Sequence, residues 1–181
     1  MADQRPHDAL LAALADIERH VGSAGWDQPA RLFALVETQQ LIAAEPGLAA
    51  HLAGALPDSF SAVEQDGFHA GDDLEQALAR IYWPATVAGC ALAIERAFLP
   101  RYHEADIPDD DTAAAFVANH PARQDVRVVV GVLRDGTNHG LARIVTEPDE
   151  LLGGVDLVPG LAAALLGTLS ETPEEEGTPQ P

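Results

Sequence analysis

Three charged residues, Glu95, Arg127 and Arg143, lie in segments that we predict to be β-strands. In a common sheet their side chains can face one another. A carboxylate opposite a guanidinium group forms a cross-strand ion pair, whereas two neighbouring guanidinium groups can bind an anion. We interpret the three residues first as a cross-strand ion pair and second as an anion-binding arginine pair.

An enzyme or small-ligand site in this chain has to be assembled from scattered residues, because no catalytic motif is present. The sequence contains neither Gly-x-Ser-x-Gly nor a glycine-rich phosphate loop. No two of the seven histidines have the His-x-x-x-His spacing that places two metal ligands on one helical face. The catalytic residues therefore stay unknown, and the candidate ligand-binding residues are Glu95, Arg96, His120, Arg127 and Arg143.

Two further groups could do chemistry, and both have a simpler interpretation. The single cysteine, Cys90, lies in an apolar stretch, where a thiol behaves as a small hydrophobic group. The acidic cluster at residues 106–111, with His103 and Glu104 nearby, offers oxygen ligands for a hard cation. It lacks the spacing and the glycine of a calcium loop, so we interpret it as a solvated loop and helix cap. We predict no metal site and no cofactor.

The charge of the chain limits its partners. Twenty-nine acidic residues face ten basic ones, all of them arginine, which gives a net charge of −19. Such a field repels the phosphate backbone of nucleic acids and an anionic membrane surface, so we expect neither as a partner. A basic protein partner is compatible with it. Arginine without lysine is typical of a GC-rich bacterial genome, and acidic surfaces also suit a salt-rich cytoplasm.

Length and hydropathy predict one cytoplasmic domain. The chain has 181 residues and one cysteine, so it can bury a core but cannot form an internal disulfide. Residues 1–5 carry no apolar signal core, and the longest apolar runs are shorter than a membrane span of about 20 residues. We predict a single α+β domain over residues 1–170 and a disordered acidic tail over residues 171–181.

The first third of the chain predicts a layer of three helices. Apolar residues recur at helical spacing over residues 7–21. Asp27 is the expected N-cap of a second helix that runs to the break at residues 45–47. Its buried side would carry Leu32, Leu35, Val36 and Ile42. A short third helix over residues 48–56 completes the layer.

The rest of the chain predicts a sheet with helices on it. Residues 85–98 contain a glycine and are bounded by prolines at 84 and 100, which favours a strand, with a buried helix as the alternative. A β-hairpin turns at Asp135-Gly136. The further expected elements are a strand near residues 60–63, a helix capped by Asp72 that ends near Tyr82, a helix over residues 112–119, hairpin strands over residues 124–134 and 139–146, and a helix over residues 161–169.

Both faces of the first hairpin strand are largely apolar. Val126, Val128, Val130 and Val132 share one face, and the opposite face, with Arg127, Val129, Gly131 and Leu133, is also largely apolar. In a sheet with one solvent-exposed face, apolar and polar residues alternate more strictly along each strand. We therefore expect helices or a partner to cover both faces. The predicted fold class is α+β: an N-terminal helical layer followed by a small, mostly antiparallel sheet with packed helices.

Several short strings together resemble a family of conserved hypothetical proteins from actinobacteria, over about residues 7–169. They are Gly-Trp-Asp-Gln-Pro at residues 25–29, Trp-Pro at 83–84, Gly-Cys-Ala-Leu at 89–92, Glu-Arg at 95–96, Leu-Pro at 99–100, His-Pro at 120–121, Leu-Arg-Asp-Gly at 133–136 and Asp-Leu-Val-Pro-Gly-Leu at 156–161. The resemblance implies no activity and no site residues.

These observations favour a non-enzymatic protein-interaction module. The absence of a catalytic motif, the two-sided apolar hairpin and the acidic surface all agree with that interpretation. It would act through a protein partner or through self-association. The alternative is an enzyme or small-ligand binder that uses the five scattered Glu, Arg and His residues.

Overall fold

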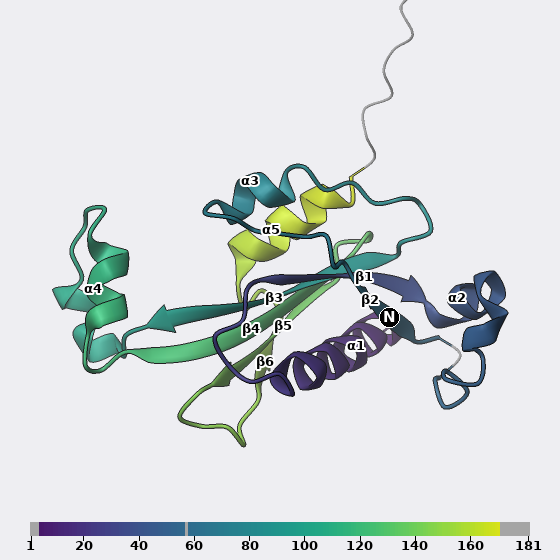
Figure 1. The fold of residues 1–181 in the computed structure, drawn as a ribbon, viewed down its shortest axis with the longest axis horizontal. Coiled ribbons are helices and arrows are strands. Elements are labelled where there is room, and N and C mark those ends of the chain that lie inside the picture. Colours follow the sequence, from purple (N-terminus) through teal and green to yellow (C-terminus); the bar gives the residue numbers. More distant parts are fainter. Residues whose placement is uncertain (1–3, 57, 171–181) are drawn as a thin grey trace, which may run out of the picture.

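A computed structural model describes residues 4–56 and 58–170 of the chain, and it contains one open antiparallel sheet with the strand order β2-β1-β3-β4-β5-β6 (Figure 1). The predicted α+β class is confirmed, whereas the predicted tail at residues 171–181 lies outside the described residues. The strands are β1 (Arg31–Glu37), β2 (Phe60–Glu64), β3 (Gly89–Phe98), β4 (Gln124–Leu133), β5 (Asn138–Ile144) and β6 (Leu152–Gly154). The helices are α1 (Arg5–Gly22), α2 (Thr38–Ala44), α3 (Leu74–Leu78), α4 (Ala113–Asn119) and α5 (Pro159–Thr168), with short 3-10 helices at Pro46–Leu48 and Arg101–Asp106.

The longest pairing in the sheet joins β3 and β4. Their register runs from Gly89 opposite Leu133 to Phe98 opposite Gln124. The strand interpretation of residues 85–98 is therefore confirmed from Gly89 onward. The β4–β5 hairpin is confirmed too, and Gly136 in its turn has a φ of +90°, a left-handed conformation that favours glycine.

Helices cover both faces of the sheet, as the two-sided apolar hairpin predicts. α1 lies on one face, and α3 and α5 lie on the other (Figure 1). The α1 face buries Leu10, Leu14 and Ile17 against sheet residues such as Val129. The opposite face buries a second cluster that includes Leu165 of α5. Because both faces of the sheet are covered by apolar layers, polar and apolar residues alternate little along β3 and β4.

Gly131 allows α1 to lie close to β4. A Cβ at this position would stand 2.6 Å from Cδ2 of Leu14 and 3.0 Å from Cδ1 of Leu10. Any larger residue would push the helix off the strand or force these leucines to move. The single glycine in this valine-rich strand therefore provides the space that the side chains of α1 occupy.

The predicted N-terminal layer of three helices is wrong beyond its first member. The segment interpreted as a second helix contains β1, a strand inside the sheet, and only Thr38–Ala44 is helical. Leu32, Phe33, Ala34 and Leu35 are all buried because β1 is covered on both faces. A short apolar run of this kind has no period that separates a buried strand from a buried helix.

Two smaller predictions are also corrected. The expected third helix over residues 48–56 is replaced by the 3-10 turn Pro46–Leu48 and further turns. α3 is capped by Asp73, whose side chain accepts a hydrogen bond from the Gln76 N–H at 2.9 Å, and it ends at Leu78. The predicted cap was Asp72. Short helices without a long apolar stripe leave their ends poorly defined in sequence.

The far ends of β3 and β4 extend beyond the core as an arm that carries Arg101–Asp106 and α4 (Figure 1). β1 pairs with β3 only up to Ala93, which faces Arg31. Residues 94–98 of β3 pair with β4 alone in the described part of the chain. This difference in length leaves one edge of β3 without a strand partner among the described residues. None of the described helices is long and apolar enough to cross a membrane.

Candidate functional site

The sheet brings together three of the five residues predicted from sequence. Glu95 of β3 lies opposite Arg127 of β4, which lies opposite Arg143 of β5. All three belong to the face that α1 covers, because their neighbours two positions away, such as Val129, pack against α1. Glu95 Oε1 and Arg127 Nη2 are 3.4 Å apart, so the expected cross-strand ion pair is present.

Arg127 and Glu95 together hold the loop between α1 and β1. Arg127 is 2% exposed, its Nη2 donates to the carbonyl of Gly25 at 2.5 Å, and its guanidinium carbon lies 4.4 Å from the centre of the Trp26 ring. The Glu95 carboxylate accepts hydrogen bonds from the backbone N–H groups of Asp27 at 2.8 Å and Gln28 at 3.2 Å. These contacts anchor the loop to the sheet.

Arg143 pairs with α1 instead of joining Arg127 around an anion. Its Nε donates to Glu18 Oε1 at 2.5 Å and its Nη2 to Glu18 Oε2 at 3.0 Å. The hydrogen bond to Glu18 raises the pKa of Arg143 above its ordinary value. Since each arginine already faces a carboxylate and Arg127 is closed to solvent, the trio serves to attach α1 and its loop to the sheet.

The other two predicted residues lie elsewhere. His120 follows α4 on the arm, where its Nδ1 accepts a hydrogen bond from the Ala122 N–H at 3.0 Å and its ring stands 5.5 Å from Phe116 and 4.6 Å from His103. Arg96 follows Glu95 in β3 and therefore belongs to the opposite face of the sheet. The five residues do not converge on one pocket.

The acidic cluster and the cysteine show no built site. Asp110 accepts hydrogen bonds from the backbone and hydroxyl of Thr112, which lower the pKa of Asp110. Within residues 4–56 and 58–170, no group of three or more His, Cys, Asp or Glu side chains could hold a metal ion. Cys90 is fully buried, and burial raises the pKa of its thiol to about 11.

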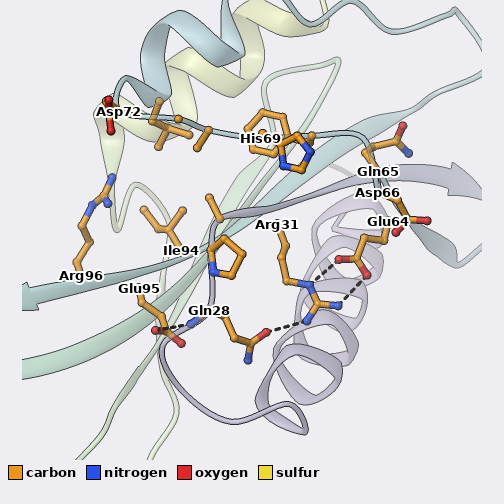
Figure 2. A pocket seen from close by; sticks show the side chains of 16 residues that line it. Gln28, Arg31, Glu64, Gln65, Asp66, His69, Asp72, Ile94, Glu95 and Arg96 are labelled. Carbon is orange, nitrogen blue, oxygen red and sulfur yellow. Dashed lines mark hydrogen bonds and ion pairs between the residues drawn. The ribbon is translucent and has the colours of Figure 1, made fainter.

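The most promising site is a groove of about 740 Å³ that sequence reasoning missed (Figure 2). Its walls come from the segment before β1, the end of β2, the loop before α3 and the middle of β3. Ala30, Phe68, Leu74 and Ile94 give it an apolar part. Four carboxylates and two guanidinium groups line it, namely Glu64, Asp66, Asp72 and Glu95 with Arg31 and Arg96.

Only some of these charges are available to a ligand. Arg31 donates to Glu64 through Nε at 2.5 Å and Nη2 at 2.7 Å, and to Gln28 through Nη1 at 3.0 Å. The bond between them raises the pKa of Arg31 and lowers the pKa of Glu64. The charges of this pair cancel.

Asp66, Asp72 and Arg96 are exposed and form no salt bridge with any described residue. Figure 2 shows Asp72 and Arg96 at the end of the groove away from Arg31. The charge of Asp66 nevertheless helps to raise the pKa of Arg31. The lining carries four carboxylates and two guanidinium groups, and Arg127 faces one of the carboxylates, Glu95, so the groove is acidic at neutral pH. It therefore favours a positively charged ligand.

The groove opens on the free edge of β3. The N–H of Gln65 donates to the carbonyl of Leu32 at 2.8 Å, so the backbone groups of Leu32 face β2. Successive residues of a strand direct their backbone N–H and C=O groups to opposite sides. The backbone groups of Arg31 therefore face β3, where Arg31 is paired with Ala93. Beyond Ala93, no described strand occupies this side of β3.

Sequence reasoning missed the groove because its residues come from distant segments of the chain. Phe68 and Asp72 belong to a stretch without a strong period, and Ile94 is separated from them by more than twenty positions. Of its lining residues, only Glu95 and Arg96 were among the candidates predicted from sequence, and the run of acidic and glycine residues at 66–73 also fits a solvated loop. The apolar Phe68 inside that loop is the feature that could have marked a packed wall.

A comparison with protein families matches residues 10–170 to the family described as PPA1309-like protein. The chain belongs to the PPA1309-like protein family. The match begins within α1 and runs through α5, so the sheet, the groove and the arm all lie inside the family region. No curated protein and no solved structure matched the chain.

A pair of histidines gives this family member a predictable response to acid. His7 of α1 and His139 of β5 are joined by a hydrogen bond of 3.1 Å between their ring nitrogens. Burial, and then the charge of His7, lower the pKa of His139 below its ordinary value of 6.5. The folded protein therefore binds this proton less tightly than the unfolded chain does. The stability that neutral His139 contributes is complete above the ordinary pKa and is lost as the pH falls below it.

We accordingly expect His139→Gln to lose less stability than the wild type between about pH 7.5 and about pH 5. Urea unfolding at the two pH values measures the difference. His69→Gln, which changes an exposed histidine in the groove, is the control and should keep the wild-type loss. An identical acid response in His139→Gln and the wild type would contradict the prediction.

Proposed function

We propose that the protein is a non-enzymatic protein-interaction module that docks a basic segment of a partner protein in the groove beside β3. The observation that carries this proposal is the combination of a free strand edge with an acidic, partly apolar groove next to it. Strand edges offer unpaired backbone groups, which proteins normally cover unless they are used for binding.

Charge supports a basic partner at two levels. The chain as a whole carries a net charge of −19, which attracts cationic partners over a distance. Within the groove, Asp72 and Asp66 form no salt bridge with a described residue, and Asp66 acts on Arg31 only through its charge. Complementary charge of this kind speeds association and selects partners more than it adds affinity.

The apolar part of the groove supplies the affinity that charge alone does not. Phe68 and Leu74 are partly buried against the core, and Ile94 belongs to it. Side chains of a docked segment can extend this apolar cluster and remove more of it from water. The groove thus combines apolar and charged lining residues, as protein interfaces commonly do.

Self-association is the less favoured form of the proposed interaction. Two copies would each bring a net charge of −19, which opposes their contact. The alternative function, a small-ligand binder or enzyme built from the scattered Glu, Arg and His residues, has to use Arg127 and Arg143, which face Glu95 and Glu18. We therefore favour a basic protein partner. We place the module in the cytoplasm on the basis of its hydropathy, and in an actinobacterium because its short strings resemble an actinobacterial family.

Two substitutions of charged residues in the groove should change the affinity for a basic peptide in opposite directions. We expect Asp72→Asn to weaken binding of the acetylated and amidated peptide Lys-Val-Lys-Val-Lys-Val by about threefold, since it removes an attractive charge at the rim. Arg96→Ala should strengthen binding by a similar factor, since it removes a repulsive one. Titration calorimetry of the full chain measures both, and added salt should weaken binding in each case.

The matched control is Glu147→Gln, which makes the same charge change as Asp72→Asn at an exposed position outside the groove. It should leave binding within error of the wild type. A Glu-Val repeat of the same length should not bind. Absence of binding by the Lys-Val peptide, or equal effects of Asp72→Asn and Glu147→Gln, would refute the groove as the docking surface. Binding of inorganic phosphate or a dicarboxylate instead would favour the small-ligand alternative.

A further inference from the structure

We infer that the partner segment binds as an added β-strand, antiparallel to β3 and in line with β1. This inference rests on the proposed function and specifies the conformation of the partner and the backbone groups that receive it. β3 continues for five residues past its last pairing with β1, and β4 supports it over that whole length. The edge is therefore preformed before a partner arrives.

Two residues of β3 present their backbone to the empty position. The backbone groups of Ala93 face β1, and alternation turns those of Glu95 and Ala97 to the same side. Those of Arg96 and Phe98 face β4, where they are paired with Val126 and Gln124. An added strand can therefore exchange hydrogen bonds with Glu95 and Ala97 without breaking any bond in the sheet.

The protein's own chain turns away from this position. Before β1 begins, the backbone N–H groups of Asp27 and Gln28 are bound by the Glu95 carboxylate, which lies on the α1 side of the sheet. The next residue, Pro29, has no N–H to donate to a ladder. The segment that could have extended β1 along β3 is thus held out of line with it.

The added strand would direct alternate side chains toward the groove. Those side chains would meet the apolar surface at Ile94 and Phe68 and the carboxylates of Asp66 and Asp72. A segment with basic and apolar residues fits both features. The chain's own residues 171–181 contain four glutamates and no basic residue, so charge argues against them as the occupant.

Backbone methylation of the probe peptide tests the added strand. In Lys-Val-Lys-Val-Lys-Val, an N-methyl group on an amide that faces β3 removes a hydrogen bond, whereas one on an outward amide does not. We expect affinity to fall at least about fivefold when methyl groups occupy one alternating set of amides and to stay nearly unchanged for the other set. Equal effects of both sets would overturn strand addition while peptide binding itself still supports the groove. If the unmodified peptide fails to bind, the proposed function fails instead.

Amide hydrogen exchange on the full chain gives a second, independent readout. In the free protein, the amides of Glu95 and Ala97 should exchange faster than those of Arg96 and Phe98, and only the first two should gain protection when the peptide is added. Ala97→Pro, which removes one edge N–H, should weaken binding at least about threefold, whereas Ala97→Ser should not. Protection that appears elsewhere, without any change at Glu95 and Ala97, would place the peptide off this edge.

Discussion

Replacement of Arg127 by methionine is expected to lower the free energy of unfolding by about 3 kcal/mol. The guanidinium group is 2% exposed and faces Glu95, so its removal leaves that carboxylate without its cation. The Glu95 side chain keeps 16% exposure and its two backbone N–H donors, which holds the loss near the lower end of values for broken buried pairs. The loop at Gly25 and Trp26 also loses its contacts with the sheet.

Urea unfolding of the variant measures this loss, and two further variants identify its cause. Arg19→Met removes an exposed partner of Asp16, and it should cost about 0.5 kcal/mol or less. The double variant Glu95→Gln/Arg127→Met removes the uncompensated charge but keeps a hydrogen-bond acceptor, so it should recover part of the stability. If Arg127→Met were as mild as Arg19→Met, the ion pair would not be what anchors the loop.

Truncation of Leu165 to alanine is expected to cost about 3 kcal/mol. Leu165 lies on α5, is fully buried and packs into the cluster that includes Cys90 and Leu92. Its removal leaves a cavity between helix and sheet that the strands cannot close, because β3 and β4 are held by ten residue pairs. The backbone of α5 is unaffected by the change, since alanine is a good helix former.

The neighbouring residue provides a matched control on the same helix. Leu166 is 37% exposed, so Leu166→Ala removes the same atoms from a position that is partly in water. It should cost about 1 kcal/mol or less. Thermal or urea unfolding of the two variants compares them directly, and similar losses for both would contradict the placement of α5 on the sheet.

The regular elements that could be predicted from sequence are those whose signal is local. α1 shows apolar residues at helical spacing, and the structure buries Leu10, Leu14 and Ile17 from that stripe. The β4–β5 hairpin combines a valine-rich strand with a turn at Gly136 that needs a left-handed residue. In each case a few neighbouring side chains specify the backbone without help from the rest of the chain.

The elements that sequence reasoning placed wrongly depend on distant contacts. β1 was interpreted as part of a helix because its apolar run Leu32–Leu35 has no distinguishing period, and pairing with both β2 and β3 makes it a strand. The hydrogen bonds that decide this come from residues about 25 to 60 positions away in the chain. No local propensity can report them.

For the candidate sites, residue type and register were predictable but environment was not. The alternating strands placed Glu95, Arg127 and Arg143 in line, as the sheet does. The sequence by itself determined this alignment, together with the α+β class and the acidic charge. Only the tertiary structure decided that Glu18 takes Arg143, that the loop at Gly25 closes over Arg127, and that the end of β3 stays free beside an acidic groove. Periodicity and charge are properties of neighbouring residues, whereas burial and open edges arise only when distant segments pack together.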